Sequence, residues 1–161
     1  MVIIQDTREK EGKKDHILNV FKELNIPVLR KKLNYGDYMI YGKEYISVDV
    51  KQDVMEIVNN YTIQHKRFQK ECENAQKHGI KLIFLIEEPL NSIYSLQYWK
   101  CKKYRWKVVN GKRTREPYTK MSGESLMKGL LTMQQRYGCE FRFCKKEETG
   151  YKILKILLEE E

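Results

Sequence analysis

The feature that most limits the fold of this chain is an unbroken apolar segment near its middle. Residues 82–86 read Leu-Ile-Phe-Leu-Ile, between Lys81 and Glu87. A strand of this kind has no polar face, so both of its faces must be buried. Only a sheet that is covered on each side by other elements provides such burial. The segment therefore predicts an inner strand at residues 81–87 of a layered α/β fold.

Periodicity in the rest of the sequence predicts the elements around this strand. Short β-branched or alternating segments predict strands at about residues 2–5, 27–33, 38–41, 45–50 and 139–144, with turns at 34–37 and 42–44. Apolar residues at helical spacing predict helices at about residues 12–24, 53–77, 123–136 and 150–158. The second helix is long and either straight or kinked. Because helices cover strands that must in part be parallel, we expect an α/β layer sandwich.

Length and composition limit the class of protein. A chain of 161 residues corresponds to one globular domain, so we expect a single domain over residues 1–161. No apolar segment approaches the roughly 20 residues of a membrane-spanning helix, and the first residues do not resemble a secretory signal. We therefore expect a cytoplasmic protein with four reduced cysteines. None of these cysteines forms a Cys-x-x-Cys pair, which argues against a zinc site.

Nearly all of the net charge lies in one segment. The formal charge is +9, and residues 91–120 hold nine basic side chains and one acid, which gives +8. The same segment holds both tryptophans and four tyrosines. Basic side chains neutralise phosphates and aromatic rings stack on bases, so we predict nucleic-acid binding in preference to a solvated basic loop. The candidate contact residues are Arg105, Trp106, Lys107, Lys112, Arg113 and Arg115.

A turn signal lies inside this basic segment. Asn110-Gly111 is typical of a two-residue turn that joins two antiparallel strands. With that turn, Val108 faces Arg113 and Trp106 faces Arg115 across the ribbon. We expect Arg115 to stack on Trp106 as a cation–π pair. A flexible loop is the alternative.

Charged side chains also gather at or just beyond the predicted strand ends, namely Asp6, Arg8, Glu9, Asp37, Asp49, Lys51 and Asp53. Asp49 and Lys51 are two residues apart on one strand, so they project from the same face. Such a pair is usually a surface ion pair of little energetic weight. Here the two lie in an apolar inner strand, where an idle charge is costly. Carboxylates that converge with a lysine can hold Mg²⁺ and orient a water for attack on a phosphodiester, so a metal-dependent nuclease is a candidate function.

Three short motifs in a fixed order identify a family resemblance. The sequences Asp6-Thr7-Arg8-Glu9, Tyr35-Gly36-Asp37-Tyr38 and Val48-Asp49-Val50-Lys51 resemble the nuclease domain of XPF-type structure-specific endonucleases, within the PD-(D/E)XK superfamily. Lys66-Arg67-Phe68 is similar to the family's Arg-Leu segment, and the resemblance extends over nearly the whole chain. It implies a restriction-endonuclease-like three-layer sandwich, in which a central mixed sheet is flanked by helices.

The resemblance also implies a metal centre. Asp37 and Asp49 would ligate Mg²⁺ or Mn²⁺, with the main-chain carbonyl of Val50 as a third ligand. Asp6 would ligate through a water or a second ion. Lys51 would position the attacking water or stabilise the developing negative charge.

The remaining implications concern the substrate. Glu9 joins the catalytic group, and Arg8 and Arg67 would lie near the scissile phosphate. The implied substrate is branched DNA, such as a fork, flap or junction, cut to leave a 5′-phosphate. The implied process is DNA repair, recombination or phage DNA processing in a bacterial or phage-infected cell. The alternative is a DNA- or RNA-binding module with a weak or inactive nuclease site. The altered Asp49-Val50-Lys51 core favours an inactive site, and basic aromatic loops also suit single-stranded RNA.

The sequence departs from the family pattern in several places. Asp49 stands where the family usually has Glu, and Val50 stands in place of Arg. The family's later acid falls at Met55, with Asp53 and Glu56 as the nearest acids. Residues 1–161 contain no tandem helix-hairpin-helix module, so we expect the segment at about 91–120 to supply DNA contacts instead.

The last predicted helix indicates self-association. Five apolar side chains give it more apolar surface than one buried stripe requires, and they are Ile153, Leu154, Ile156, Leu157 and Leu158. XPF-type nuclease domains tend to pair through helices at the end of the domain. We therefore expect a homodimer through the C-terminal helices.

Overall fold

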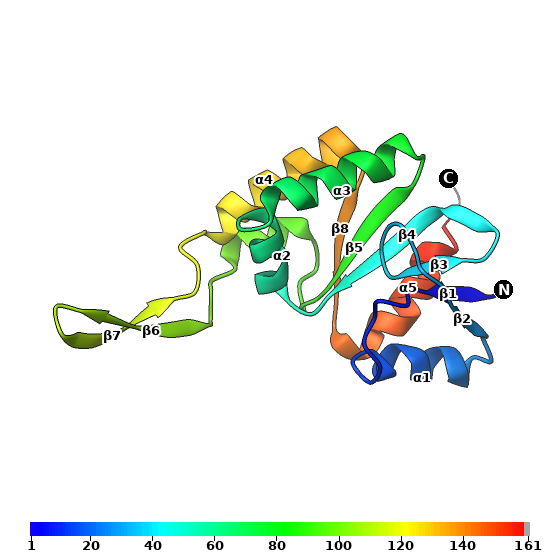
Figure 1. Ribbon diagram of the computed structural model, residues 1–161, viewed down its shortest axis with the longest axis horizontal. Helices are drawn as coiled ribbons and strands as arrows, with labels where there is room; N and C mark the ends of the chain where they lie inside the picture. Colours follow the sequence, from blue (N-terminus) through cyan, green and yellow to red (C-terminus); the bar gives the residue numbers. More distant parts are fainter. Residues whose placement is uncertain (160–161) are drawn as a thin grey trace.

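The central layer of the molecule is a mixed six-stranded sheet with the order β2-β1-β3-β4-β5-β8 (Figure 1). The computed structural model describes residues 1–159. The strands of the sheet are β1 Ile3–Gln5, β2 Val28–Arg30, β3 Tyr38–Ile40, β4 Lys43–Lys51, β5 Lys81–Glu87 and β8 Glu140–Cys144. Strand β3 runs antiparallel to β1 and β4, whereas β4, β5 and β8 are parallel to one another. The predicted mixed sheet is confirmed.

Helices form the two outer layers. Helices α3 and α4 lie over one face of the sheet, and α1 and α5 lie over the other (Figure 1). The helices are α1 Asp15–Glu23, α2 Val54–Tyr61, α3 His65–Lys77, α4 Gly123–Tyr137 and α5 Thr149–Leu157, with short 3-10 turns at Ile93–Tyr98 and Lys146–Glu148. Among residues 1–159, none of the helices has the length and apolar character needed to cross a bilayer.

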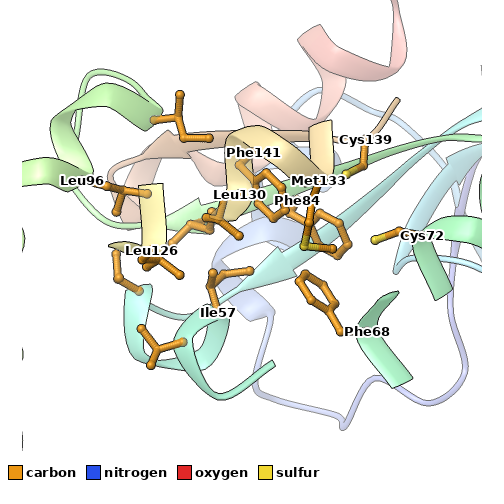
Figure 2. Packing of buried hydrophobic residues seen from close by; sticks show 14 of the residues in the cluster. Ile57, Phe68, Cys72, Phe84, Leu96, Leu126, Leu130, Met133, Cys139 and Phe141 are labelled. Carbon is orange, nitrogen blue, oxygen red and sulfur yellow. The ribbon is translucent and has the colours of Figure 1, made fainter. Parts of the chain in front are cut away.

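Strand β5 joins the two halves of the core, as its apolar sequence predicts. Leu82, Phe84 and Ile86 face the cluster beneath α2, α3 and α4. Ile83 and Leu85 face the cluster beneath α1 and α5. In the first cluster the ring of Phe84 stacks on Phe141 of β8, with centroids 5.1 Å apart (Figure 2). All five side chains are buried, so β5 fixes the position of its neighbour β4.

The region predicted as one long helix over residues 53–77, either straight or kinked, forms two helices separated at residues 62–64. At the end of α2 the Val58 carbonyl accepts both the Thr62 amide, at 2.9 Å, and the Thr62 hydroxyl, at 2.7 Å. Ile63 is 82% exposed, so no buried contact pulls this turn onto the core. The break lets α3 run in a new direction, along the side of the sheet that carries Asp49.

Three predicted boundaries also need correction. Helix α1 begins at Asp15 instead of residue 12, because Gly12 has a φ of +85° in the preceding turn. The turn between β3 and β4 consists of Tyr41 and Gly42, since Lys43 already pairs with Ile40. Strand β2 ends at Arg30, short of residue 33.

The basic segment contains a β-hairpin, so the alternative of a flexible loop is wrong. Strands β6 Tyr104–Val109 and β7 Lys112–Pro117 pair in the predicted register, with Trp106 opposite Arg115. The predicted cation–π pair of Arg115 with Trp106 is wrong, because each arginine stacks on the ring that lies diagonally across the ribbon. Arg113 lies over Trp106 at 4.5 Å and Arg115 over Tyr104 at 4.3 Å. Strand twist brings such diagonal neighbours within reach of long side chains.

The apolar side chains of α5 do not form a free surface. Ile153, Leu154, Ile156 and Leu157 are all buried, packed with α1 and the sheet. Of the five only Leu158 is exposed, at 53%. The helix has many apolar residues because it is enclosed on more than one side. These residues are therefore not evidence for a contact between subunits. The homodimer itself stays a prediction.

Candidate active site

A polar cavity of about 300 Å³ opens where strand β4 ends. Its lining comes from five parts of the chain: the segment after β1, the turn before β3, the end of β4, the end of α2 with the following turn, and α3. The lining residues are Asp6, Arg8, Gly36, Asp37, Asn60, Asp49, Lys51, Gln64, Arg67, Phe68 and Glu71. The structure therefore brings together all three motifs that carry the family resemblance.

Asp49 and Lys51 project from the same face of β4 into this cavity. The Lys51 Nζ atom lies 2.8 Å from Asp49 Oδ1, and the two side chains are 13% and 11% exposed. The pair is thus largely enclosed, unlike a surface ion pair. Burial alone would lower the pKa of Lys51, but the charge of Asp49 and a hydrogen bond to its carboxylate raise it above the ordinary value. Lys51 therefore forms a charged pair with Asp49 in the cavity.

Asp37 is held against β4 by its own carboxylate and by the glycine before it. The amide of Val50 donates a 2.8 Å hydrogen bond to Asp37 Oδ2. Gly36 has a φ of +67°, and a Cβ atom built there would lie 2.3 Å from Ser47 Oγ. Only glycine allows this close approach, which explains why glycine precedes the acid. The turn thereby places Asp37 beside Asp49.

The ionised form of the Asp37 carboxyl group is disfavoured when no metal ion is bound. Its pKa is raised well above the ordinary 3.8 by burial first, then by the negative charges of Asp49 and Glu9. The hydrogen bond from Val50 and the charge of Lys51 oppose this increase without cancelling it. A cation bound between the carboxylates would remove the repulsion.

This raised pKa predicts a pH-dependent loss of stability. Because folding favours protonated Asp37, the contribution is present below about pH 3.8 and is lost as pH rises through the raised pKa. Asp37→Asn should therefore raise the thermal midpoint at pH 7 in a metal chelator, and the gain should vanish at low pH. Differential scanning calorimetry of both proteins at the two pH values measures it, and a lower midpoint for the variant at pH 7 would contradict the assignment.

Asp6 and Arg8 form one unit at the rim of the cavity. Asp6 is 2% exposed, and its Oδ2 atom lies 2.6 Å from both Nε and Nη2 of Arg8. Its Oδ1 atom accepts longer bonds from the main-chain amides of Arg8 and Leu33. Both oxygens of Asp6 are thus engaged, in an arrangement that fixes the Arg8 side chain. Arg8 also donates to the Leu33 carbonyl at 2.8 Å, and its side chain is 59% exposed.

The acids that follow Lys51 do not line the cavity. Asp53 caps α2 by accepting the amide of Glu56 at 2.9 Å, and its other oxygen binds Lys103 at 3.0 Å. Glu56 accepts the amide of Gln52 at 2.8 Å. Met55, at the family's acidic position, is buried in the core. These residues start a helix and anchor the segment that leads to the hairpin.

Glu71 lines the cavity although the sequence did not single it out. It lies on α3 one helical turn after Arg67, so both side chains face the same way. Burial, and then the charge of Asp49, raise the pKa of Glu71 above its ordinary value. The positive charges of Lys51, Arg67 and Arg8 oppose this increase without cancelling it. The four-residue spacing from Arg67 was the signal in the sequence that could have identified Glu71. The direction of α3 after the break at residues 62–64 then determines that the helix face with Arg67 and Glu71 meets β4.

The donor atoms in the cavity suit a hard cation. Among the described residues, no three His, Cys, Asp or Glu side chains lie in a geometry that would hold a metal ion. Two carboxylates do meet here, and the repulsion at Asp37 is the kind that bound Mg²⁺ or Mn²⁺ relieves. Such ions take oxygen ligands, often one or two carboxylates with waters. The residues present therefore fit the ion that the resemblance implies.

The other candidate residues lie at the exposed side of the cavity or outside it. Arg67 lines the cavity on its exposed side. The basic and aromatic residues of the hairpin stand beyond the end of α2, away from the body of the molecule (Figure 1). Glu9 is absent from the lining, although its charge acts on Asp37.

Comparison with known proteins gives two kinds of match. A family model described as the ERCC4 domain matches residues 5–157. No curated protein sequence matches the chain. XPF from Aeropyrum pernix has a similar structure, with a TM-score of 0.65 and 14% identity over 98% of this chain and 63% of that chain. The structure of XPF from the same organism in complex with DNA gives 0.63 and 15% over 96% and 62%. The chain thus spans less than two thirds of these proteins, and the likeness establishes the fold.

Proposed function

The chain belongs to the ERCC4 domain family, and on that premise we propose that it is a metal-dependent DNA endonuclease. The observation that carries the proposal is the meeting of Asp37, Asp49 and Lys51 in one cavity, with Arg8 and Arg67 at its rim. We further propose that residues 1–161 form a single nuclease domain that carries a basic hairpin.

The proposed mechanism assigns a role to each side chain. Asp37 and Asp49 would hold Mg²⁺ or Mn²⁺, with the Val50 carbonyl as a third donor. The bound ion would activate water and polarise the phosphodiester. Lys51, which is charged in its pair with Asp49, would donate a hydrogen bond to the attacking water or to a phosphate oxygen as the negative charge of that oxygen increases.

The arginines at the rim would bind the phosphate backbone. Arg8 is held by Asp6, so its guanidinium is preorganised for a phosphate oxygen. This contact favours a positioning role for Asp6 over direct metal ligation. Glu9 would act through its charge on Asp37.

The proposed substrate is branched DNA, such as a fork, flap or junction, cut to leave a 5′-phosphate. Such an activity would serve repair, recombination or phage DNA processing. One observation favours a different function, that of a binding module without cleavage. The family's later acid is Met55 here, and it is buried in the core, so that position supplies no carboxylate.

A cleavage assay separates the two functions. End-labelled fork, flap, four-way junction and linear duplex are incubated with the protein in Mg²⁺, in Mn²⁺ and in chelator, beside a matched RNA fork. The nuclease proposal predicts metal-dependent cutting of at least one branched DNA, faster than of the linear duplex. Binding of the same DNA without cutting in either metal would favour the inactive module, and preferred binding or cutting of the RNA fork would favour an RNA function.

Glu71 is predicted to support the metal site. Its charge acts on Asp49 within the shared cavity, where a further carboxylate would strengthen binding of a divalent cation, directly or through water. Glu71→Gln should weaken Mn²⁺ binding roughly 10-fold, the lower end of what loss of an outer partner costs at metal sites. Isothermal calorimetry measures the affinity, with Glu73→Gln as the control on the same helix outside the cavity. Equal affinities for the two variants would exclude this role.

Self-association remains a proposal that the family resemblance alone supports. A homodimer would place two cavities on one branched substrate. Light scattering at micromolar concentration should then give about twice the monomer mass of 19.4 kDa. To test whether the C-terminal helix forms the contact between subunits, Leu158→Glu is the suitable change, because Leu158 is exposed. A charge at the buried Ile156 would instead disrupt the core. A monomer mass at every concentration would rule out the dimer.

A further inference from the structure

The hairpin β6–β7 presents two faces of different chemistry. Its side chains alternate between them, and residues directly opposite across the ribbon share a face. One side, here named the aromatic face, consists of Tyr104, Trp106, Val108, Arg113, Arg115 and Pro117. The other side, here named the lysine face, consists of Arg105, Lys107, Val109, Lys112, Thr114 and Glu116. Glu116 is half-buried, and the other residues of both faces are exposed.

The aromatic face holds its rings in fixed positions without burying them. The guanidinium of Arg113 covers Trp106, and that of Arg115 covers Tyr104. Trp106 nevertheless keeps 61% of its surface exposed, and Val108 keeps 71%. Exposed apolar side chains of this size contribute nothing to the core, and as a contiguous group they indicate a binding surface. The cation–π contacts restrict the motion of the Trp106 and Tyr104 side chains, so a ligand that binds them loses less conformational entropy.

Charge further distinguishes the two faces. The only acid of the segment, Glu116, lies on the lysine face, where it pairs with Arg105 at 2.7 Å and Lys107 at 3.5 Å. The two arginines of the aromatic face therefore have no acid beside them on that face. A surface that combines positive charge with guanidinium planes and partly exposed aromatic rings is complementary to an anion with flat, unpaired rings of its own.

The root of the hairpin is fixed next to the active-site strand. Lys103 forms its ion pair with Asp53, two residues after Lys51, and Cys101 Sγ lies 3.7 Å from Met55 Sδ. The amide of Tyr118 closes the ribbon by donating to the Lys103 carbonyl at 2.9 Å. Six-residue strands extend about 20 Å from this root. The root of the hairpin therefore lies near the strand that carries Asp49 and Lys51, and its tip points away from the body of the molecule (Figure 1).

We propose that the aromatic face binds unpaired bases of a DNA strand adjacent to the cleavage site. Bases within a duplex stack on one another and leave no free ring face, whereas bases of a single strand can stack on aromatic rings or on guanidinium planes. The place of cleavage rests on the proposed function, but the preference of this face for unpaired bases does not. The hairpin would then recognise the single-stranded arm of a branched substrate.

A comparison of the two faces tests the proposal. One variant combines Tyr104→Ala with Trp106→Ala, and the matched control combines Lys107→Ala with Lys112→Ala. Fluorescence anisotropy in chelator measures binding to oligothymidylate, to a blunt duplex and to oligouridylate at several salt concentrations. The absence of metal prevents cleavage, so the result does not depend on nuclease activity.

The two variants should behave differently. The aromatic variant should bind oligothymidylate at least about 5-fold more weakly, with duplex affinity and the salt slope nearly unchanged, as expected when base stacking is removed. The lysine variant should weaken both DNAs and reduce the salt slope. Trp106→Phe should retain most of the single-strand affinity. Equal losses on both DNAs, no loss on oligothymidylate, or tighter binding of oligouridylate than of oligothymidylate by the parent would each overturn the proposal.

Discussion

Asp49→Asn is expected to reduce the cleavage rate at least about 100-fold, as loss of other preorganised electrostatic groups does. The carboxylate is largely enclosed with Lys51 in the cavity, and asparagine keeps its shape while removing its charge. Asp37→Asn and Lys51→Ala should each have an effect of the same order. Binding of DNA should stay largely intact, because the basic hairpin and the rim arginines are unchanged. Single-turnover cleavage of a labelled fork in Mg²⁺ measures the loss.

The matched control for this prediction is Asp53→Asn. Asp53 also follows β4, but it caps α2 and lies outside the cavity, and asparagine caps helices as well as aspartate does. Its ion pair with Lys103 is a largely exposed contact of little energetic weight, so the control should cut at nearly the parental rate. An Asp49→Asn protein that cut as fast as the parent would remove this cavity as the active site. An Asp53→Asn protein that lost cleavage while binding DNA normally would transfer the role to the acid after Lys51.

The second large effect is expected for the hairpin as a source of DNA affinity. Changing Arg105, Lys107, Arg113 and Arg115 to alanine together removes half of the charge of residues 91–120. For every phosphate that the variant no longer neutralises, the log–log salt slope on duplex DNA should fall by about 0.9, and so by up to about 3.6 in all. Anisotropy across a salt series measures the change. An unchanged slope would mean that the hairpin is a solvated surface feature.

Removing the hairpin provides an independent check. The hydrogen bond between Lys103 and Tyr118 closes its root, so a short turn can replace residues 104–117 without opening the core. This deletion should weaken DNA binding at least as much as the quadruple variant and leave the thermal midpoint nearly unchanged. A large decrease in the midpoint would show that the hairpin supports the fold as well.

The sequence predicts well what depends on local pattern. The apolar segment at β5, the shared face of Asp49 and Lys51, and the register set by Asn110-Gly111 all follow from side-chain alternation or turn chemistry. These features need only a few neighbouring residues. The motif order then identifies which strand ends must meet, and the cavity contains all three motifs.

The remaining features depend on packing at a distance. Glu71 lines the cavity because the chain turns at residues 62–64, between α2 and α3, and nothing in the local pattern sets the direction of α3. The cation–π pairs shift to diagonal partners because the ribbon twists. The apolar surplus of α5 is buried because α1 packs beside it, which one helix considered alone cannot reveal.

We propose that Asp37 and Asp49, which share the cavity where β4 ends, bind the metal that drives hydrolysis. The most direct test measures Mn²⁺ binding by calorimetry and cleavage of a labelled fork on the same samples, for the parent and for Asp49→Asn. The account predicts that the parent cleaves only as its site fills and leaves a 5′-phosphate, and that Asp49→Asn loses both the binding isotherm and cleavage. Cleavage by the parent in chelator, or full Mn²⁺ binding and cleavage by Asp49→Asn, would contradict it.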